Sequence, residues 1–400
     1  MNTSTRQTVN QRRLTNFAVE NSHQNAKLGE KWKKWLQNWC GGVTLSLCLS
    51  ALAATQVQAA TYSFTKIADT KSFPWQSISN PVINDSGTVA FLVTSTRQSQ
   101  YISGYKIVYT SNGNQLTEIV NSDNLPSLLF ASSEFPGGRN YFLNSVEGIN
   151  NNGTIAFTAF HRGIDIFTTS QNGFTTRRAF GTISLGGGTV EVSQPRLNDL
   201  EEVVYLERSF AFNTNTIVLS RPNSFGNRLI ARGNSGSYPP PPPNVLFSEF
   251  SSFDINNNSE VVFAATSRDG TKAIYTNRGG SVSPLVETGA NALDINDSGD
   301  VALLTGNTIR LFHRATGILN AIANTSGQFR GFGNPVINNS GKVAFAATLA
   351  LGESGIFTGA DPVNDKVIAS GDTLFGSTVK SVRFSRQGLN NQGQIVFLAE

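Results

Sequence analysis

Short runs of alternating hydrophobic and polar residues fill the chain from about residue 61 onwards, and one nine-residue phrase recurs seven times. In each copy an Ile or Leu precedes an Asn, and a Val or Ile stands five residues after that Asn. Aliphatic and β-branched residues on both sides of a polar turn predict a β-hairpin. The seven copies lie 40 to 66 residues apart, at Asn84, Asn150, Asn198, Asn256, Asn296, Asn338 and Asn390.

The Asn and a Gly three residues later account for the turn. An Asn side chain bonds its own backbone two residues on. A Gly suits the left-handed position of a three-residue hairpin loop that is closed by a bulge. Glu201 and Ser259 replace this Gly in two copies, so we expect those turns to be strained or differently built. The predicted structural turn residues are Asn84, Gly87, Asn150, Gly153, Asn296, Gly299, Asn338, Gly341, Asn390 and Gly393.

Two further short apolar runs follow most copies, and no stretch has helical periodicity. Four short strands per unit of about 50 residues predict an all-β fold, a β-propeller of seven blades. The apolar run 64–68 belongs to no unit. We expect it to complete the last blade, which closes the ring and covers a sheet edge. That blade has no third strand of its own, so three strands are expected there. An open solenoid and two packed sandwiches are the alternatives.

The first 59 residues have the character of a targeting segment. Basic residues at 33–34 precede an apolar run at 43–54, and small residues lead to Ala59. This pattern predicts a secretory signal peptide with a long polar leader, cleaved after Ala59. The run is too short to span a membrane, and an uncleaved anchor is the alternative. We expect a secreted or extracytoplasmic protein, in the periplasm or at the cell surface, with no transmembrane segment in the mature chain.

The mature chain is then one repeat domain over residues 60–400, interrupted by a Pro-rich loop at 238–244. Five consecutive prolines form a stiff extended segment without backbone donors. We interpret the loop as an exposed spacer, and a docking site for an aromatic groove is the alternative.

Removing the leader changes the charge and the reactive side chains. The whole chain carries a formal net charge of +4, but residues 60–400 contain 24 basic and 25 acidic side chains. That balance speaks against nucleic-acid binding, which needs clustered Lys and Arg. Cys40 and Cys48 both lie in the leader, so the mature chain has no disulfide, thiolate zinc site or Cys nucleophile. His161 and His313 stand in no hydrolase motif, and the sequence predicts no cofactor and no catalytic residue.

Two candidate sites follow from the repeat. The strand before each Asn is expected to be innermost, and polar residues four positions before the Asn are predicted to bind a ligand in the channel. They are Asn80, Gln194, Ser252, Asn334 and Arg386. No metal is expected. The alternative is a calcium loop, because one copy resembles the start of D-x-[DN]-x-[DN]-G, although Thr305 takes the place of its final Glu. The oxygen ligands would be Asp294, Asn296, Ser298 and Asp300.

The repeat resembles the tandem N-x-x-G-x-x-x-A-F repeats of the bacterial choice-of-anchor proteins over essentially all of residues 61–400. It is also similar to the blade phrase of TolB-type propellers, which is an analogy of fold alone. The resemblance implies an extracytoplasmic repeat protein and supplies no catalytic residues. No C-terminal anchor precedes Glu400, which puts surface attachment in doubt. We expect a monomeric, non-enzymatic binding, adhesion or scaffold module whose partner is an unknown extracellular glycan or envelope protein. A propeller enzyme acting on polysaccharide or peptide is the alternative.

Overall fold

The structure is a computed structural model of the whole chain. It describes residues 16–21, 62–96, 105–125, 142–160, 163–170, 175–181, 189–222, 227–234 and 246–400. Outside these ranges lie the rest of the predicted signal peptide with Ala59, the Pro-rich loop 238–244 and His161. The predictions made for them stay predictions.

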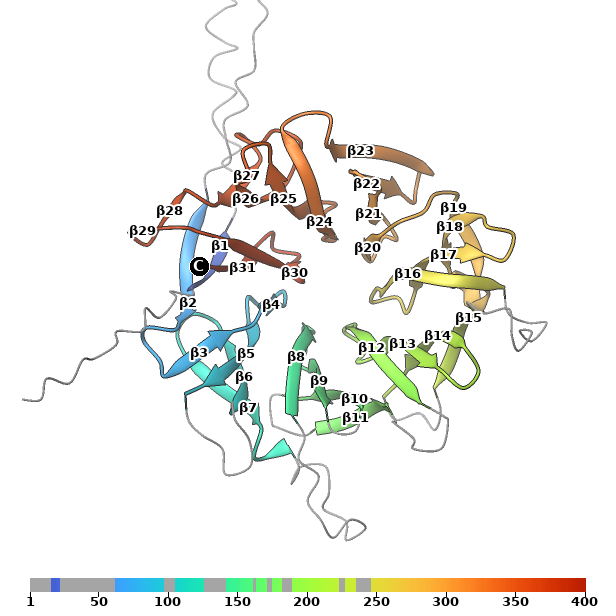
Figure 1. Cartoon of the computed structure of the whole chain (residues 1–400), viewed down its shortest axis with the longest axis horizontal. Helices are drawn as coiled ribbons and strands as arrows, with labels where there is room; N and C mark the ends of the chain where they lie inside the picture. The colour runs from blue at the N-terminus through green and yellow to red at the C-terminus, as the bar shows by residue number, and fades with distance from the viewer. Residues whose placement is uncertain are drawn as a thin grey trace, which may run out of the picture.

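The predicted all-β propeller arrangement is confirmed. Antiparallel sheets radiate from a central space, and the strand that precedes each repeated Asn lies nearest to it (Figure 1). The only helix in the described ranges is a single 3-10 turn, η2 (Arg278–Gly280). The all-β character follows from the composition of the apolar runs. They are rich in β-branched and aromatic residues, which favour strands.

The hydrogen-bonded sheets follow the order of the chain. The first contains β3 (Trp75–Ile78), β4 (Val82–Ile83), β5 (Val89–Ser95), β6 (Lys106–Ser111) and β7 (Leu116–Asn121). The second contains β8 (Phe142–Ile149), β9 (Ile155–Phe160), β10 (Ile164–Thr169) and β11 (Thr175–Phe180). The next eight strands form one sheet: β12 (Val190–Leu197), β13 (Val203–Ser209), β14 (Thr214–Ser220), β15 (Arg228–Asn234), β16 (Phe247–Ile255), β17 (Val261–Ser267), β18 (Lys272–Thr276) and β19 (Ser283–Val286).

Two four-stranded sheets and one small hairpin follow. The first sheet contains β20 (Ala292–Ile295), β21 (Val301–Thr305), β22 (Thr308–His313) and β23 (Ile318–Asn324). The second contains β24 (Phe329–Ile337), β25 (Val343–Leu349), β26 (Ser354–Phe357) and β27 (Lys366–Ala369). The hairpin pairs β28 (Thr373–Leu374) with β29 (Ser377–Thr378).

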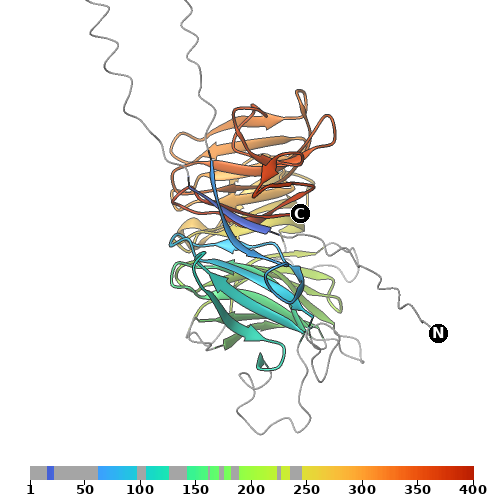
Figure 2. The ribbon, with the colours of Figure 1, turned by 90° about the vertical axis from the view of Figure 1, so that its left-hand side faces the viewer.

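The two ends of the chain meet in the last sheet, β2-β1-β31-β30. Its strands are β30 (Val382–Leu389), β31 (Ile395–Ala399), β1 (Asn16–Asn21) and β2 (Ser63–Asp69). β1 pairs antiparallel with both β31 and β2, and Figure 2 shows these N-terminal strands beside the C-terminal ones. The expectation of three strands in this sheet is wrong, because a segment of the predicted leader pairs with the edges that β31 and β2 would otherwise leave open.

The number of strands per sheet is less regular than seven equal blades. Four sheets have four strands, the first has five, and one has eight. The eight-stranded sheet is two runs of four, β12 to β15 and β16 to β19, joined by one parallel pair between Gly233 and Phe247. This pair joins the end of β15 to the first residue of β16.

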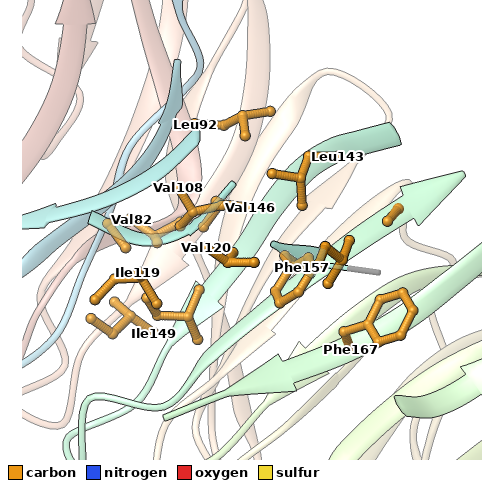
Figure 3. Packing of buried hydrophobic residues seen from close by; sticks show 14 residues of the cluster. Val82, Leu92, Val108, Ile119, Val120, Leu143, Val146, Ile149, Phe157 and Phe167 are labelled. Atoms are coloured by element: carbon orange, nitrogen blue, oxygen red, sulfur yellow. The ribbon is translucent and has the colours of Figure 1, made fainter. Parts of the chain in front are cut away.

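The hydrophobic core lies between neighbouring sheets rather than in one central cluster. Val82, Val108 and Val120 of the first sheet meet Val146 and Phe157 of the second in one buried cluster (Figure 3). Each sheet has a neighbour on both faces, so its second strand is buried on both sides, as the five consecutive buried residues of β5 and of β9 show. This explains why these strands are apolar throughout instead of alternating.

Candidate functional site: the asparagine rings and the channel cavity

The seven repeated turns have the geometry that the sequence predicts. Asn84 Oδ1 accepts a hydrogen bond from the Thr88 amide at 2.9 Å, and the Gly87 amide donates to the Asn84 carbonyl at 3.0 Å. Gly87 has φ 78°, as the left-handed position requires. Glu201 and Ser259 occupy the same position with φ 58° and 57°. The expected strain in those two turns is therefore confirmed, since side chains other than Gly disfavour this region.

The same asparagines also link each repeat to the next. The Asn84 side-chain amide donates to the Asn150 carbonyl at 3.0 Å, and the series continues until Asn390 donates to the Asn84 carbonyl at 2.8 Å. The intermediate bonds measure 3.0–3.2 Å and join Asn150, Asn198, Asn256, Asn296, Asn338 and Asn390 in that order. All seven asparagines are buried. They form a continuous ring of hydrogen bonds, which we call the inner asparagine ring.

The residues that follow these asparagines form a second ring around the same axis. Each backbone amide donates to the side-chain Oδ1 of the next member at 2.7–2.9 Å. Its members are Asp85, Asn151, Asp199, Asn257, Asp297, Asn339 and Asn391. Carboxylates and amides nearly alternate, so Asn151 donates to both Asp85 and Asp199, at 2.7 and 2.8 Å. The alternation gives each carboxylate amide donors instead of a like charge next to it.

Inside the rings lies a cavity of about 140 Å³ that residues of all seven repeats line. The strands β8, β12, β16, β20 and β30 lie around the central space (Figure 1), and each contributes charged or amide residues to the lining of the cavity. We call them the channel cluster: Glu147, Arg196, Asp254, Asp294, Arg386 and Gln387. Charged groups are costly to shield from water, so their convergence here marks the candidate site.

Two arginines surround the Asp254 carboxylate. Arg196 Nε lies 3.8 Å and Arg386 Nη1 4.0 Å from Asp254 Oδ2. Arg386 reaches β16 from β30, which lies across the central space (Figure 1). There it donates to the Ser252 hydroxyl at 2.9 Å and to the Phe253 carbonyl at 3.4 Å. Burial, and after it the positive charge of Arg196, lowers the pKa of Arg386 to about 10, while the nearby carboxylates act in the opposite direction. Arg386 stays charged at neutral pH.

Arg196 carries an unused donor in this cavity. Its side chain is buried beside the Phe253 ring, with the guanidinium carbon 5.8 Å from the ring centre, and one Nη donates to the Pro195 carbonyl at 2.8 Å. Its Nε is buried and has no hydrogen-bond partner. A buried donor without a partner costs free energy, and an acceptor entering the cavity would relieve that cost.

The surroundings of Asp294 favour its protonated form. Its Oδ2 accepts a hydrogen bond from the Ile337 amide at 2.6 Å. Burial raises the pKa of the Asp294 carboxyl well above its usual range, and the adjacent Asp254 charge raises it further. The Ile337 amide and Arg386 act in the opposite direction but do not outweigh burial. Asp294 therefore offers a hydroxyl donor at a pH where an exposed Asp would be ionised.

Gln387 completes the wall on the side of β8. It accepts a hydrogen bond from the Ile149 amide at 2.9 Å. A Cβ added to Gly148 would lie 2.8 Å from Gln387 Oε1, so this close approach depends on a Gly at 148. Glu147, from the same strand, accepts a hydrogen bond from the Ser145 hydroxyl at 2.5 Å.

Of the five predicted ligand-binding residues, the structure brings two to the cluster. Arg386 lines the cavity, and Ser252 is buried behind it as the hydroxyl that Arg386 contacts. Asn80, Gln194 and Asn334 are exposed and are not part of the cavity wall. The inner strands β12 and β24 carry irregularities that include Gln194 and Asn334, which disturbs the simple count of four residues there.

The residues of the alternative calcium site have different surroundings and do not converge on one point. Asp294 faces the channel, Asn296 belongs to the inner asparagine ring, and Asp300 accepts a hydrogen bond from the Arg314 amide at 2.8 Å. Ser298 is exposed. In the described part of the chain no three His, Cys, Asp or Glu side chains are grouped as metal ligands. His313 lies 3.8 Å from the other Asp300 oxygen, on the outer side of β21.

Sequence reasoning predicted Arg386 as a channel residue and Asp294 only as an alternative calcium ligand, and it missed Glu147, Arg196, Asp254 and Gln387. Arg196, Asp254 and Asp294 share one place in the repeat. All three stand two residues before a repeated Asn. The other four copies have Val82, Gly148, Val336 and Gly388 at this position. Charged residues at a position that is otherwise small or apolar were the available signal.

Comparisons with known proteins place the chain in a family and identify similar folds. No curated protein matches it. Similar solved structures include a prolyl endopeptidase (12% identity, TM-score 0.48, 79% of this chain and 45% of that one). Others are virginiamycin B lyase from Staphylococcus aureus (12%, 0.39, 81% and 99%) and the β-propeller domain of the Trilobed protease from Pyrococcus furiosus (11%, 0.44, 78% and 88%). The chain spans less than half the length of the prolyl endopeptidase.

None of the helical structure in the described ranges is long and apolar enough to cross a membrane. The model of one family matches residues 8–228 and again 76–400, two overlapping matches such as an internal repeat produces. The match does not support the resemblance of the repeat to the choice-of-anchor proteins. The chain belongs to DUF7453, a family of unknown function.

Proposed function

We propose that this protein is a secreted, non-enzymatic binding module that holds a polar group of an extracellular glycan or envelope protein in its channel. The convergence of Arg196, Asp254, Asp294 and Arg386 on one cavity is the observation that carries the proposal. Extracytoplasmic location rests on the sequence of residues 1–59, and the binding role on the cluster.

The proposed architecture is seven blades closed through N-terminal strands. Seven asparagine turns linked in one continuous ring support this count. Dividing the eight-stranded sheet at its single parallel pair yields two blades of four strands. In the uncleaved chain, the pairing of β31 with β1 and of β1 with β2 supports this closure.

The cavity limits the size and chemistry of the ligand. A volume of about 140 Å³ is similar to the ~150 Å³ that accommodates a benzene-sized molecule. It therefore takes one sugar ring or one side-chain group rather than a whole polymer. Arg196 and Arg386 offer donors to a carboxylate or hydroxyl, and Asp254 offers an acceptor. The expected ligand group carries at least one acidic oxygen and one hydroxyl.

A binding screen of glycans and envelope extract, run with and without a chelator, tests this function. The protein is compared with Arg386→Gln and with Arg383→Gln, an exposed arginine that pairs only with Glu400. We expect saturable binding that survives the chelator, falls at least tenfold in Arg386→Gln and changes less than twofold in Arg383→Gln. Equal affinities of the three proteins, or no binding by any of them, would contradict a channel site.

A propeller enzyme is a second candidate because the channel contains a carboxyl pair. Asp294, with its raised pKa, matches the requirement for a general acid next to the Asp254 carboxylate. The two carboxyls interact directly, whereas glycosidase pairs are separated by about 5 Å or more. Incubation with the glycan retained in the screen, followed by product analysis, separates the two functions. Turnover that Asp294→Asn abolishes would establish the enzyme, and unchanged glycan supports the binding module.

A further inference from the structure

A second cavity, of about 450 Å³, lies beside β15 and β18, between the strands β12 to β15 and the strands β16 to β19. Three arginines line it: Arg221 follows β14, Arg228 begins β15, and Arg278 lies in η2. It shares only Asp297 with the channel cavity, so the two sites are separate. Its volume is within the range of about 300–1,000 Å³ that ligand sites occupy.

Two of the three arginines, Arg228 and Arg278, have no carboxylate partner in the described ranges. Arg228 donates to the Gly280 carbonyl at 2.9 Å, which is an uncharged partner. In the ranges that the structure describes, no carboxylate lies within ion-pair distance of Arg228 or Arg278, and both are exposed. Arg221 pairs with Glu202 through Nε at 2.7 Å.

The two carboxylates in the cavity wall are already engaged elsewhere. Glu260 forms an ion pair with Arg314 and accepts a hydrogen bond from the Thr276 hydroxyl at 2.6 Å. Asp297 accepts from the side-chain amides of Asn257 and Asn339, at 3.1 and 2.6 Å, within the second ring. Neither carboxylate is oriented to neutralise Arg228 or Arg278, so the cavity presents net positive charge.

We propose that this cavity binds the acidic groups of a carboxylated or sulfated polysaccharide. The planar guanidinium group holds carboxylate and sulfate oxygens through two parallel hydrogen bonds. Three arginines around a cavity of this volume suit two or three sugar units that carry more than one anionic group. Nucleic acid is disfavoured because residues 60–400 have nearly balanced charge, and binding to a phosphate backbone needs a broader basic surface.

Titration of the full chain with hexagalacturonate, and with a neutral hexasaccharide for comparison, tests the proposal. The double variant Arg228→Gln with Arg278→Gln is matched by Arg268→Gln with Arg330→Gln, two exposed arginines away from the cavity. We expect binding of the acidic oligosaccharide alone, at least tenfold weaker in the cavity variant and changed less than twofold in the matched one. Inorganic sulfate should compete if sulfated glycans are also accepted.

Several results would overturn this assignment. They are no binding of hexagalacturonate by the unmodified protein, an equal loss in both double variants, or loss of the probe in Arg386→Gln. The last result would place the probe in the channel and not between the sheets. Both double variants change exposed side chains, and an unchanged thermal unfolding midpoint shows that they remain folded.

Discussion

Asn338 illustrates how one residue of the inner asparagine ring serves two structures at once. Its Oδ1 accepts hydrogen bonds from the Ser340 and Lys342 amides, at 3.1 and 2.9 Å, and its side-chain amide donates to the Asn390 carbonyl at 3.1 Å. Asp would serve the turn as well as Asn, but it has no donor for the next repeat. This requirement explains why all seven copies carry Asn while the Gly varies.

Replacing Asn338 with Ala should therefore cost more than a turn alone. The change leaves the Ser340 and Lys342 amides without their acceptor and removes the side-chain donor to the Asn390 carbonyl, which keeps only the Gly393 amide. We expect the free energy of unfolding to fall by about 2–3 kcal/mol. Denaturant unfolding measures this loss. Asn320→Ala, at an exposed position in β23, is the control and should change it by less than about 0.5 kcal/mol. Equal losses in Asn338→Ala and Asn320→Ala would show that the inner asparagine ring does not stabilise the protein.

The two turns without Gly should gain stability when Gly is restored. Ser259 has φ 57°, and its side chain makes none of the hydrogen bonds described for the turn. We expect Ser259→Gly to raise the free energy of unfolding by about 1 kcal/mol. The reverse change, Gly341→Ser, should lower it similarly, because Gly341 has φ 81° and open space around its Cα. Calorimetry that finds the same sign for both changes would refute strain as the cause.

Asp294 should make stability depend on pH in a defined direction. Its pKa is raised above the ordinary value of 3.8, so its contribution is fully present below that pH and is lost as pH rises through the folded-state pKa. Asn cannot ionise, so Asp294→Asn removes this loss of stability at higher pH. The thermal midpoint of the variant, relative to the unmodified protein, should therefore increase between pH 4 and pH 8.

Asp269→Asn is the control of opposite sign. The hydrogen bond from the Ser267 hydroxyl lowers the pKa of Asp269, and the Thr271 amide lowers it further. Its ionised form is therefore the favoured one in the folded state. The relative midpoint of this variant should decrease slightly over the same pH range. A flat difference for Asp294→Asn would show that its carboxyl is not shielded from water.

Among the elements, the hairpins and their apolar strands could be predicted from sequence, but their partners could not. The Ile-Asn start and the Val-Ala-Phe end identify β4 and β5 directly, since both are local patterns. β1 carries no such pattern, and its pairing with β31 joins residues nearly 400 positions apart. Local periodicity contains no information on such a contact, and the same holds for Arg386 contacting β16 across the channel.

Packing between neighbouring elements should dominate stability. Phe157 of β9 is fully buried, stacks on Phe167 at 5.4 Å and lies in the cluster shared with the first sheet. We expect Phe157→Ala to reduce the free energy of unfolding by about 3–5 kcal/mol. Phe160, at the end of the same strand, is 44% exposed, and Phe160→Ala should cost less than about 1 kcal/mol. Denaturant titration of both variants distinguishes a shared core from general loss of aromatic area.

For the whole molecule, the closing bond between Asn390 and Asn84 makes one ring from elements at opposite ends of the chain. The predicted cleavage after Ala59 would remove β1 and keep β2. In a chain cleaved there, β1 could no longer join β31 to β2. The inner asparagine ring involves only residues from 84 onwards. For a chain cleaved after Ala59, we therefore expect closure to rest on the ring and on the packing of Ile67 and Ala68 against Val396 and Leu398.

Hydrogen exchange of the turn amides is the measurement that tests this closed ring most directly. The Thr88 and Gln394 amides flank the closing contact, and the Asp300 and Lys342 amides occupy the same place in turns away from it. A closed ring predicts similar protection for all four, lost together in Asn390→Ala. Fast exchange at Thr88 and Gln394 alone, in the unmodified protein, would show that the molecule is open between its last and first repeats.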